Sequence, residues 1–341
     1  MVNMVDEINP YEVVKSRDEK CVESNILSDL FNTDKKPDEN IINDINKNKI
    51  AIYTAFTGDY DNLKDPQFVD ENCDYICFTD NPNFESDFWE IRLMEDSTLD
   101  NNRKAKQYKV FPNKYLPDYK YSLWIDGSFK IVGSIREYIN NFINSKMLVV
   151  VHPERDCIYE EANESIKFPR YSNYTINKQT ENYASRGMPA NYGLPALGSI
   201  FREHNDSIIV DLMNQWWEEI IKYTNQDQLS FTYLMWKNNF QPSVSKVYCW
   251  INKYWTIEGQ SHHKHEIDDY ITSRNLIKSL EGNIKDTNTL TKEELLLLIH
   301  DIEALEDETL QQNIVRNNLD NQINDLKNSK SWKITSKLRR Q

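Results

Sequence analysis

One stretch, residues 119–133, constrains the fold more than any other; it reads YKYSLWIDGSFKIVG. Alternating side chains at 121–125 predict a strand, which ends at Asp126-Gly127-Ser128. In an open α/β sheet, ligands bind beyond the carboxyl ends of the strands, so an acid at a strand tip is a candidate for chemistry. Asp126-Gly127 is also an ordinary turn after a buried strand, and for the dipeptide alone that interpretation is the commoner one.

Other apolar runs have the same form and end at polar corners that carry an aspartate. Residues 50–56 are almost continuously apolar, which is typical of a strand buried on both faces, and a polar turn follows at 57–61. Residues 75–78 end in Thr79-Asp80-Asn81-Pro82. Further strands are predicted at 89–93, 147–151, 197–201 and 247–251. This repeated pattern predicts a mostly parallel sheet whose polar corners lie at one edge.

Helices are predicted at 101–116, 134–143, 207–223 and 226–236, and the polar stretch 158–190 is interpreted as part helix and part loop. In the first helix, Arg103, Lys106 and Lys109 recur at i, i+3 and i+6 and so lie near one face. Two cations beside acidic corners suit a diphosphate, because arginine can bind phosphate oxygens in a bidentate fork. A solvated helix face is the alternative, and it is the more frequent role of charged residues on helices.

Composition and charge narrow the class of protein. A chain of 341 residues is long enough for one large α/β domain with appendages. The net charge of −14 argues against general nucleic-acid binding. The five cysteines are an odd, scattered set, which indicates reduced thiols and a cytoplasmic protein. The first residues do not read as a signal peptide, and no run of 18 apolar residues predicts a membrane span.

Three regions are predicted. Residues 1–47 are acidic and asparagine-rich, which predicts an extension, partly disordered or loosely packed, with a helical candidate at 21–31. Residues 48–265 form the α/β domain. Residues 266–341 carry leucine and isoleucine at spacings of 3 and 4, which indicates either a coiled coil through which the chain would self-associate or a helical hairpin. The basic tail at 327–341 is a candidate for peripheral contact with anionic lipid at the inner membrane surface, with a solvated tail as the equal alternative.

Polar residues elsewhere could complete a site. Asp227-Gln228 opens a predicted helix, where the aspartate either caps the helix or faces a pocket as a base or as a group that orients a sugar hydroxyl. His152 directly follows a predicted strand. His262 and His263 lie in a segment that holds three of the six histidines and are either metal or phosphate contacts or an accidental polar cluster. Eight glycines and no Gly-rich motif argue against a Gly-rich phosphate loop.

Five segments together carry a family resemblance: KIAIYTAFTGDYD, DYICFTDNP, NNRKAKQYKVFPNKYLPDYKYSLWIDGSFKI, HPERDCIYEEA and DQLSF. They resemble the glycosyltransferase-like domain found in plant turgor-regulation and mucilage proteins and in bacterial polysaccharide loci. The resemblance covers roughly residues 49–260, and the segment around WIDGS is its most specific part. It implies a GT-A-like, Rossmann-like fold. It also implies transfer of a sugar from a nucleotide donor, with a UDP-sugar the first expectation, to a glycan or lipid-linked glycan.

The resemblance also implies roles for particular residues. Base and ribose would lie against Thr54, Ala55, Phe56, Asp59 and Asp80, and the diphosphate against Arg103 and Lys106. Asp126 matches the first acid of the Asp-x-Asp metal motif, Gly127 follows it, and Ser128 stands where the second acid would be. Asp227 matches the acid placed near the acceptor or the anomeric carbon, and His152 and Gln228 complete the expected set of sugar-nucleotide contacts.

The resemblance therefore also leads us to expect a divalent metal, Mn²⁺ or Mg²⁺, at this site. Its ligands would be Asp126 and Ser128, with His262 and His263 recruited from elsewhere in the chain. The serine at the second acid position leaves metal dependence undecided. Two alternative functions also stay open: a nucleotide-sugar hydrolase, and a catalytically silent nucleotide- or sugar-binding scaffold that works through its C-terminal helices.

Overall fold

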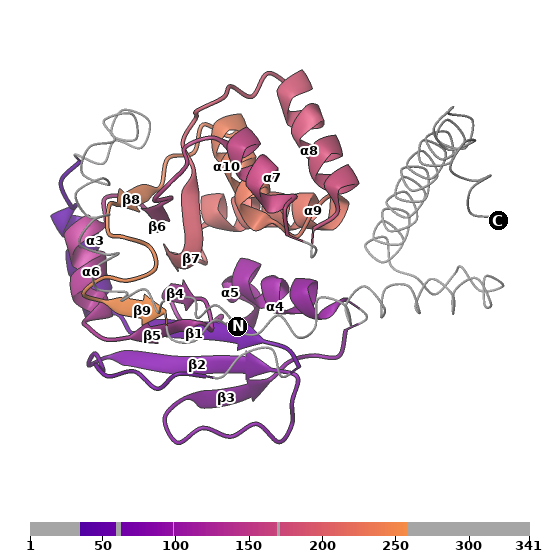
Figure 1. Cartoon of the computed structure of the whole chain (residues 1–341). Coiled ribbons are helices and arrows are strands. Elements are labelled where there is room, and N and C mark those ends of the chain that lie inside the picture. The colour runs from indigo at the N-terminus through magenta and orange to yellow at the C-terminus, as the bar shows by residue number, and fades with distance from the viewer. Residues whose placement is uncertain (1–34, 59–62, 98, 169–170, 258–341) are drawn as a thin grey trace, which may run out of the picture. The chain divides into compact units, whose positions relative to one another are not determined.

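The computed structural model describes residues 35–58, 63–97, 99–168 and 171–257 (Figure 1). All of them belong to the first of two compact units of the chain, Met1–Asp286. Several expectations lie outside the described residues: the helical candidate at 21–31, Asp59, His262, His263, and the helical region with its basic tail at 266–341. None of the described helices is both long and apolar enough to cross a membrane.

A seven-stranded sheet in the order β3-β2-β1-β4-β7-β6-β8 forms the centre of the described region (Figure 1). Its strands are β1 Ile50–Phe56, β2 Cys73–Thr79, β3 Glu90–Leu93, β4 Tyr121–Ile125, β6 Met147–Val151, β7 Pro195–Arg202 and β8 Ser243–Ser245. Every neighbouring pair is parallel except the pairs of β7, which runs antiparallel to both β4 and β6. The mixed, mostly parallel sheet expected from the sequence is confirmed.

The central strands are buried throughout and mostly apolar, because helices and loops cover both faces of the sheet. Every residue of β1, β4 and β6 is buried. Along β1, Ile50 and Ile52 belong to the core on one face, whereas Tyr53 on the other face packs edge-on against Trp124. Alternate side chains of one strand thus serve two cores, and this explains the continuous apolar runs in the sequence.

Helices flank the sheet. They are α3 Glu39–Lys47, α4 Asn101–Val110, α5 Pro112–Tyr115, α6 Ile135–Phe142, α7 Ile158–Ser165, α8 Asn173–Ser185, α9 Ser207–Lys222 and α10 Asp227–Lys237. Residues of α3 and α6 join the core that contains Ile50 and Ile52, and α4 packs against β1 and α9. Helix α10 packs against α7, α9 and β7, which brings three helices together above one end of the sheet (Figure 1).

The prediction of a single helix over 101–116 is partly wrong. Helix α4 ends at Val110, and a separate short helix, α5, starts at Pro112. Proline has no N–H to donate and disfavours helical backbone in the residue before it, so Phe111 ends one helix and precedes the next.

The prediction of a last strand at 247–251 is wrong. In the chain between β8 and β9 (Trp255–Ile257), only Ile251 makes a strand-like contact, a single bridge to Thr256. This segment forms a compact turn instead of a strand, and within it the Trp255 indole donates a hydrogen bond to the Cys249 carbonyl at 2.8 Å. Strand β9 pairs with β5, Phe129–Ile131, in a two-stranded sheet that the sequence does not reveal.

Part of the expected N-terminal extension packs on the domain. Helix α3 lies within residues 1–47, and its Ile45 is fully buried in the core. Asp38 caps this helix by accepting a hydrogen bond from the Asn40 N–H at 2.8 Å. The sequence signal, Asp38 before a helix-compatible run, is short and is lost among the other acidic and asparagine residues of the segment.

Asp70 connects the loop before β2 to helix α6. Its buried carboxylate accepts hydrogen bonds from the Ile135 N–H at 2.7 Å and the Ser134 hydroxyl at 2.5 Å. We predict that Asp70→Ala lowers the free energy of unfolding by about 2–3 kcal/mol, measured by urea denaturation, because it removes charge-assisted bonds at a helix N-terminus. Asp38→Ala, at the more exposed α3 cap, should cost only about 1 kcal/mol. Equal losses for the two variants would contradict this account.

Candidate active site

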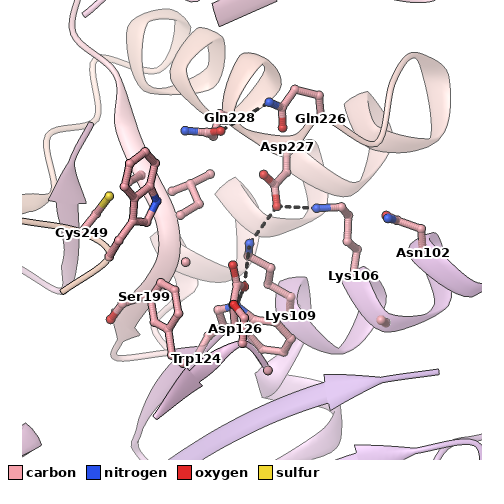
Figure 2. A pocket seen from close by; sticks show the side chains of 18 of the residues that line it. Asn102, Lys106, Lys109, Trp124, Asp126, Ser199, Gln226, Asp227, Gln228 and Cys249 are labelled. Carbon is pink, nitrogen blue, oxygen red and sulfur yellow. Dashed lines mark hydrogen bonds and ion pairs between the residues drawn. The ribbon is translucent and has the colours of Figure 1, made fainter. Parts of the chain in front are cut away.

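A cavity of about 760 Å³ opens beyond the carboxyl ends of β1 and β4 and reaches α4, α7 and α10 (Figure 2). Its size lies within the usual range for small-molecule sites. Nine of the residues predicted for the site line this cavity: Ala55, Phe56, Lys106, Asp126, Gly127, Ser128, His152, Asp227 and Gln228. Strand-end residues from distant parts of the sequence are thus brought together, whereas Thr54, Asp80 and Arg103 are not part of the lining.

Helix α4 presents Asn102, Lys106 and Lys109 to the cavity (Figure 2). These residues are spaced i, i+4 and i+7, which keeps them on one face of an α-helix. Arg103 lies off this face: its guanidinium is held by the Asp100 carboxylate at 2.9 Å and by the Tyr223 carbonyl at 3.3 Å. The expected diphosphate contact of Arg103 therefore has no support in the geometry, and the cations that α4 contributes to the cavity wall are Lys106 and Lys109.

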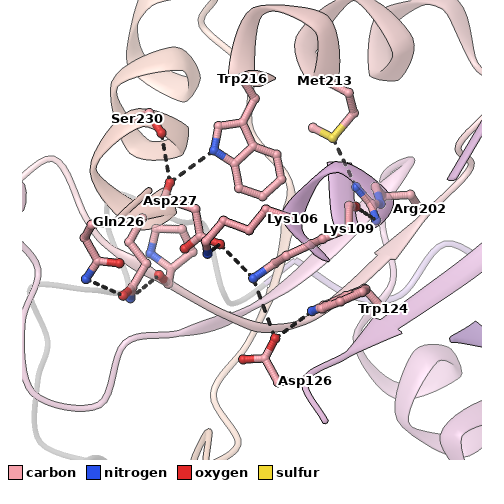
Figure 3. A network of polar contacts seen from close by, with 12 residues as sticks. Lys106, Lys109, Trp124, Asp126, Arg202, Met213, Trp216, Gln226, Asp227 and Ser230 are labelled. Carbon is pink, nitrogen blue, oxygen red and sulfur yellow. Dashed lines mark hydrogen bonds and ion pairs between the residues drawn. The ribbon is translucent and has the colours of Figure 1, made fainter. Parts of the chain in front are cut away.

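Asp227, in the first turn of α10, binds both lysines of α4 (Figure 3). Its Oδ2 accepts hydrogen bonds from Lys106 Nζ at 2.7 Å and Lys109 Nζ at 2.8 Å. The side chains of Asp227 and Lys109 are only 7% and 5% exposed. Burial alone would raise the pKa of Asp227, but the two ammonium charges outweigh it and hold that pKa well below its ordinary value. Asp227 is therefore ionised and only weakly basic.

Asp126 lies at the tip of β4 and faces the same lysine (Figure 3). Its Oδ1 accepts a hydrogen bond from the Trp124 indole at 2.7 Å and lies 3.7 Å from Lys109 Nζ. With 41% of its side chain exposed, Asp126 remains open to the cavity. The neighbouring Gly198 has no side chain, which keeps the space beside Asp126 open. A Cβ there would lie 2.8 Å from the Phe129 ring and 3.2 Å from Asp126 Oδ2.

Arg202, near the end of β7, fixes the last turn of α4 from below. Its fully buried guanidinium donates to the Lys109 carbonyl and to the Tyr53 hydroxyl, both at 2.6 Å, and to the Met213 sulfur at 3.1 Å. None of the ion pairs among the described residues gives Arg202 a carboxylate. Sequence reasoning missed Arg202, because its only signal is a charged residue at the end of an otherwise apolar strand.

Another part of the cavity wall carries an uncharged histidine, His152, and an ion pair between Arg155 and Glu161. His152 Nδ1 accepts hydrogen bonds from the N–H groups of Glu154 and Arg155, at 3.2 and 3.0 Å. Burial, together with the charge of Arg155, lowers the pKa of His152 to about 3. Glu161 accepts from Arg155 Nε at 2.6 Å and from Gln226 Nε2 at 2.9 Å. Glu161 was missed in the sequence, where nothing distinguishes it from other acids of a polar stretch.

The loop after β1 forms another part of the lining. Gly58 has a positive φ of 60° and donates its N–H to Asp80 Oδ1 at 2.8 Å. Asp80 therefore shapes this loop from behind and does not itself reach the cavity. Thr54 is buried within β1, below the strand end. Gln228, the second residue of α10, donates to the Pro195 carbonyl at 3.1 Å.

The described residues do not fit a divalent cation. Asp126 and Ser128 line the cavity, but within the described part of the chain no three His, Cys, Asp or Glu side chains are grouped as metal ligands would be. One oxygen of Asp126 already faces an indole N–H and the Lys109 ammonium, whose charge opposes a metal ion. The expected ligands His262 and His263 lie outside the described residues.

Comparison with known proteins identifies a family. A sequence model of the TOD1/MUCI70 glycosyltransferase-like domain matches residues 81–254, half of the chain, from the corner after β2 to the residue before β9. The chain belongs to this family. The family resemblance inferred from the sequence segments is thereby confirmed.

One curated relative is the probable hexosyltransferase MUCI70 of Arabidopsis thaliana. The two sequences are 24% identical in a region that covers 54% of this chain and 36% of the relative. The chain thus spans about a third of the length of the relative it matches.

The shared carboxylate of Asp227 gives a stability prediction. Asp227→Asn removes the anion that compensates two lysines, one of them almost fully buried. Breaking such a buried pair on one side should lower the free energy of unfolding by roughly 3–5 kcal/mol in a urea titration. Asp126→Asn, at an exposed position, is the matched control and should cost about 1 kcal/mol or less. A loss for Asp227→Asn no larger than the control would show that this ion pair does not hold α10 to α4.

Two buried histidines give a pH prediction. Burial lowers the pKa of His152 to about 3 and that of His204 to about 4, whereas an unfolded histidine titrates near about 6.5. The unfolded chain therefore binds more protons below pH 6.5, so stability should fall with acidification, by up to about 1.4 kcal/mol per pH unit for each histidine. Urea titrations between about pH 6.5 and 5 measure this slope, and a His152→Gln/His204→Gln variant should flatten it. An unchanged slope in the double variant would contradict the neutral state of both rings.

Proposed function

We propose that this protein is a glycosyltransferase that moves a sugar from a nucleotide-sugar donor, a UDP-sugar first among the candidates, to a glycan acceptor. One observation carries the proposal: Lys106, Lys109, Asp126 and Asp227 converge in a cavity beyond the strand ends of the sheet. Membership of a glycosyltransferase-like family supports the reaction type.

The donor would lie along the strand ends. Ala55, Phe56 and Gly58, from the loop after β1, offer an apolar and backbone surface to the base and ribose. Lys106 and Lys109 offer positive charge to the diphosphate. Cations preorganised where charge develops stabilise a departing nucleoside diphosphate, and this is the largest contribution that the described residues can make.

The low pKa of Asp227 limits its role in the reaction. A carboxylate bound by two ammonium groups is a poor acceptor for the proton of a sugar hydroxyl. Of the two roles expected for Asp227, the geometry favours positioning over proton abstraction. Asp126, more exposed and at the strand tip, is the carboxylate better placed to contact the bound sugar.

The acceptor side is supported by aromatic side chains. Trp250 and Phe168 line the cavity, yet they remain 37% and 48% exposed, unlike most aromatic residues of the described region. Exposed aromatic rings present a flat apolar face with which the C–H face of a sugar ring can pack. A glycan acceptor could therefore pack against these rings where they line the cavity.

Assays with purified protein test the proposal. We predict that incubation with UDP-sugars and a panel of oligosaccharides releases UDP together with an extended glycan, both detected by mass spectrometry. Asp126→Ala should lower turnover by a factor on the order of 100, since it removes a carboxylate from the reacting region. Asp118→Ala, which changes an exposed turn acid outside the cavity, is the control and should keep full activity.

The same assay separates the alternatives. Free sugar with no extended glycan, whichever acceptor is added, would identify a nucleotide-sugar hydrolase. Binding without any turnover would favour a scaffold. Full turnover in Asp126→Ala would remove the central role of the β4 tip.

A further inference from the structure

Positive charge exceeds negative charge around the last turn of α4. Lys106 and Lys109 are paired with Asp227, Lys109 also lies near Asp126, and Arg202 binds the Lys109 carbonyl. The charged side chains here are therefore three cations and only two carboxylates. Asp126 is the more exposed of the two and lies 3.7 Å from its lysine, so it compensates weakly. Excess buried charge is costly unless a partner neutralises it, and here an anionic ligand could do so.

The lysines retain capacity to bind such an anion. An ammonium group has three N–H donors, and the hydrogen bond to Asp227 uses one on each lysine. Both bonds end on the same carboxylate oxygen, so the two nitrogens are neighbours at the cavity wall (Figure 3). Lys109 is oriented further by the Trp124 ring, whose centroid lies 5.6 Å from Nζ. Adjacent, preorganised ammonium groups match a group with several anionic oxygens.

The same contacts work against a metal at this position. Lys109 lies near Asp126, the carboxylate expected to bind the metal, and two lysines already bind Asp227 Oδ2. Positive charge in this part of the cavity therefore already comes from the protein.

We propose that Lys106 and Lys109, held in place by Asp227, form the binding site for the diphosphate of the donor, and that this site operates without a divalent cation. The inference rests on the proposed function for the identity of the ligand as a nucleoside diphosphate. Asp227 is then a positioning residue, which fixes the two lysines at the wall before the donor arrives. When the bond between sugar and diphosphate breaks, the added negative charge on the diphosphate develops beside two fixed ammonium groups.

Calorimetric titration in the presence of EDTA tests the site. The probes are UDP, GDP, dTDP and CDP, with the nucleoside of whichever diphosphate binds as the phosphate-free reference. We expect one diphosphate to bind in EDTA, and added Mn²⁺ to leave its Kd unchanged. Lys106→Met or Lys109→Met should weaken the diphosphate roughly 10- to 100-fold, the effect of losing a hydrogen bond to a charged group, with no change for the nucleoside.

The control is Lys114→Met on α5, which removes an exposed lysine paired with Glu95, outside the cavity. This variant should bind the diphosphate like the unmodified protein, which excludes a general effect of net charge. Lys106 is less buried than Lys109, so Lys106→Met keeps the test decisive if Lys109→Met fails to fold. Unchanged nucleoside binding shows that a variant retains its cavity.

The outcomes separate this inference from the proposed function. Diphosphate binding that requires Mn²⁺, or lysine variants with unchanged affinity, would overturn the inference and leave the sugar-transfer proposal intact. No binding by any of the diphosphates, with or without Mn²⁺, would overturn both.

Discussion

The carboxylate of Asp227 is the interaction on which the candidate site depends. It joins two helices whose contacting residues are more than one hundred positions apart in the sequence, because its Oδ2 binds both Lys106 of α4 and Lys109 one turn later. Neither a buried aspartate nor a buried lysine is stable without a partner, so the docking of α10 on α4 and the placing of charge in the cavity are one event. Under the proposed function, stability and donor binding would therefore be coupled at this position.

The antiparallel strand β7 supports the same site from within the sheet. Because β7 pairs with β4, Gly198 falls beside the β4 tip, where the Cβ of any other residue would crowd Phe129 and Asp126. At the other end of β7, Arg202 reaches the Lys109 carbonyl. One strand thus contributes open space at the acid and a cation beneath the lysine, and both depend on its direction and its neighbours.

The sequence predicts the sheet well because burial leaves a local signature. Residues 50–56 are an almost continuous apolar run, 121–125 show alternation, and the polar ends of both strands fall at the cavity. The charge pattern was less informative. Spacings of three place Arg103 and Lys106 near each other. The face of α4 that lines the cavity, however, carries Asn102, Lys106 and Lys109. Only tertiary contacts decide which face turns inward. The same holds for Arg202, which binds Tyr53 and the Lys109 carbonyl, and for the contact of Glu161 with Gln226.

Under the proposed function, the distribution of charge within the cavity would set the direction in which a donor binds. On the α4 side two ammonium groups outnumber the buried carboxylate between them. On the α7 side His152 is neutral and the charges of Arg155 and Glu161 close on each other. An anionic diphosphate is attracted to the first wall and gains little from the second, whereas uncharged sugar rings suit the polar second wall and its exposed aromatic residues. Under the proposed function, this asymmetry orients the sugar toward the acceptor side before any reaction occurs.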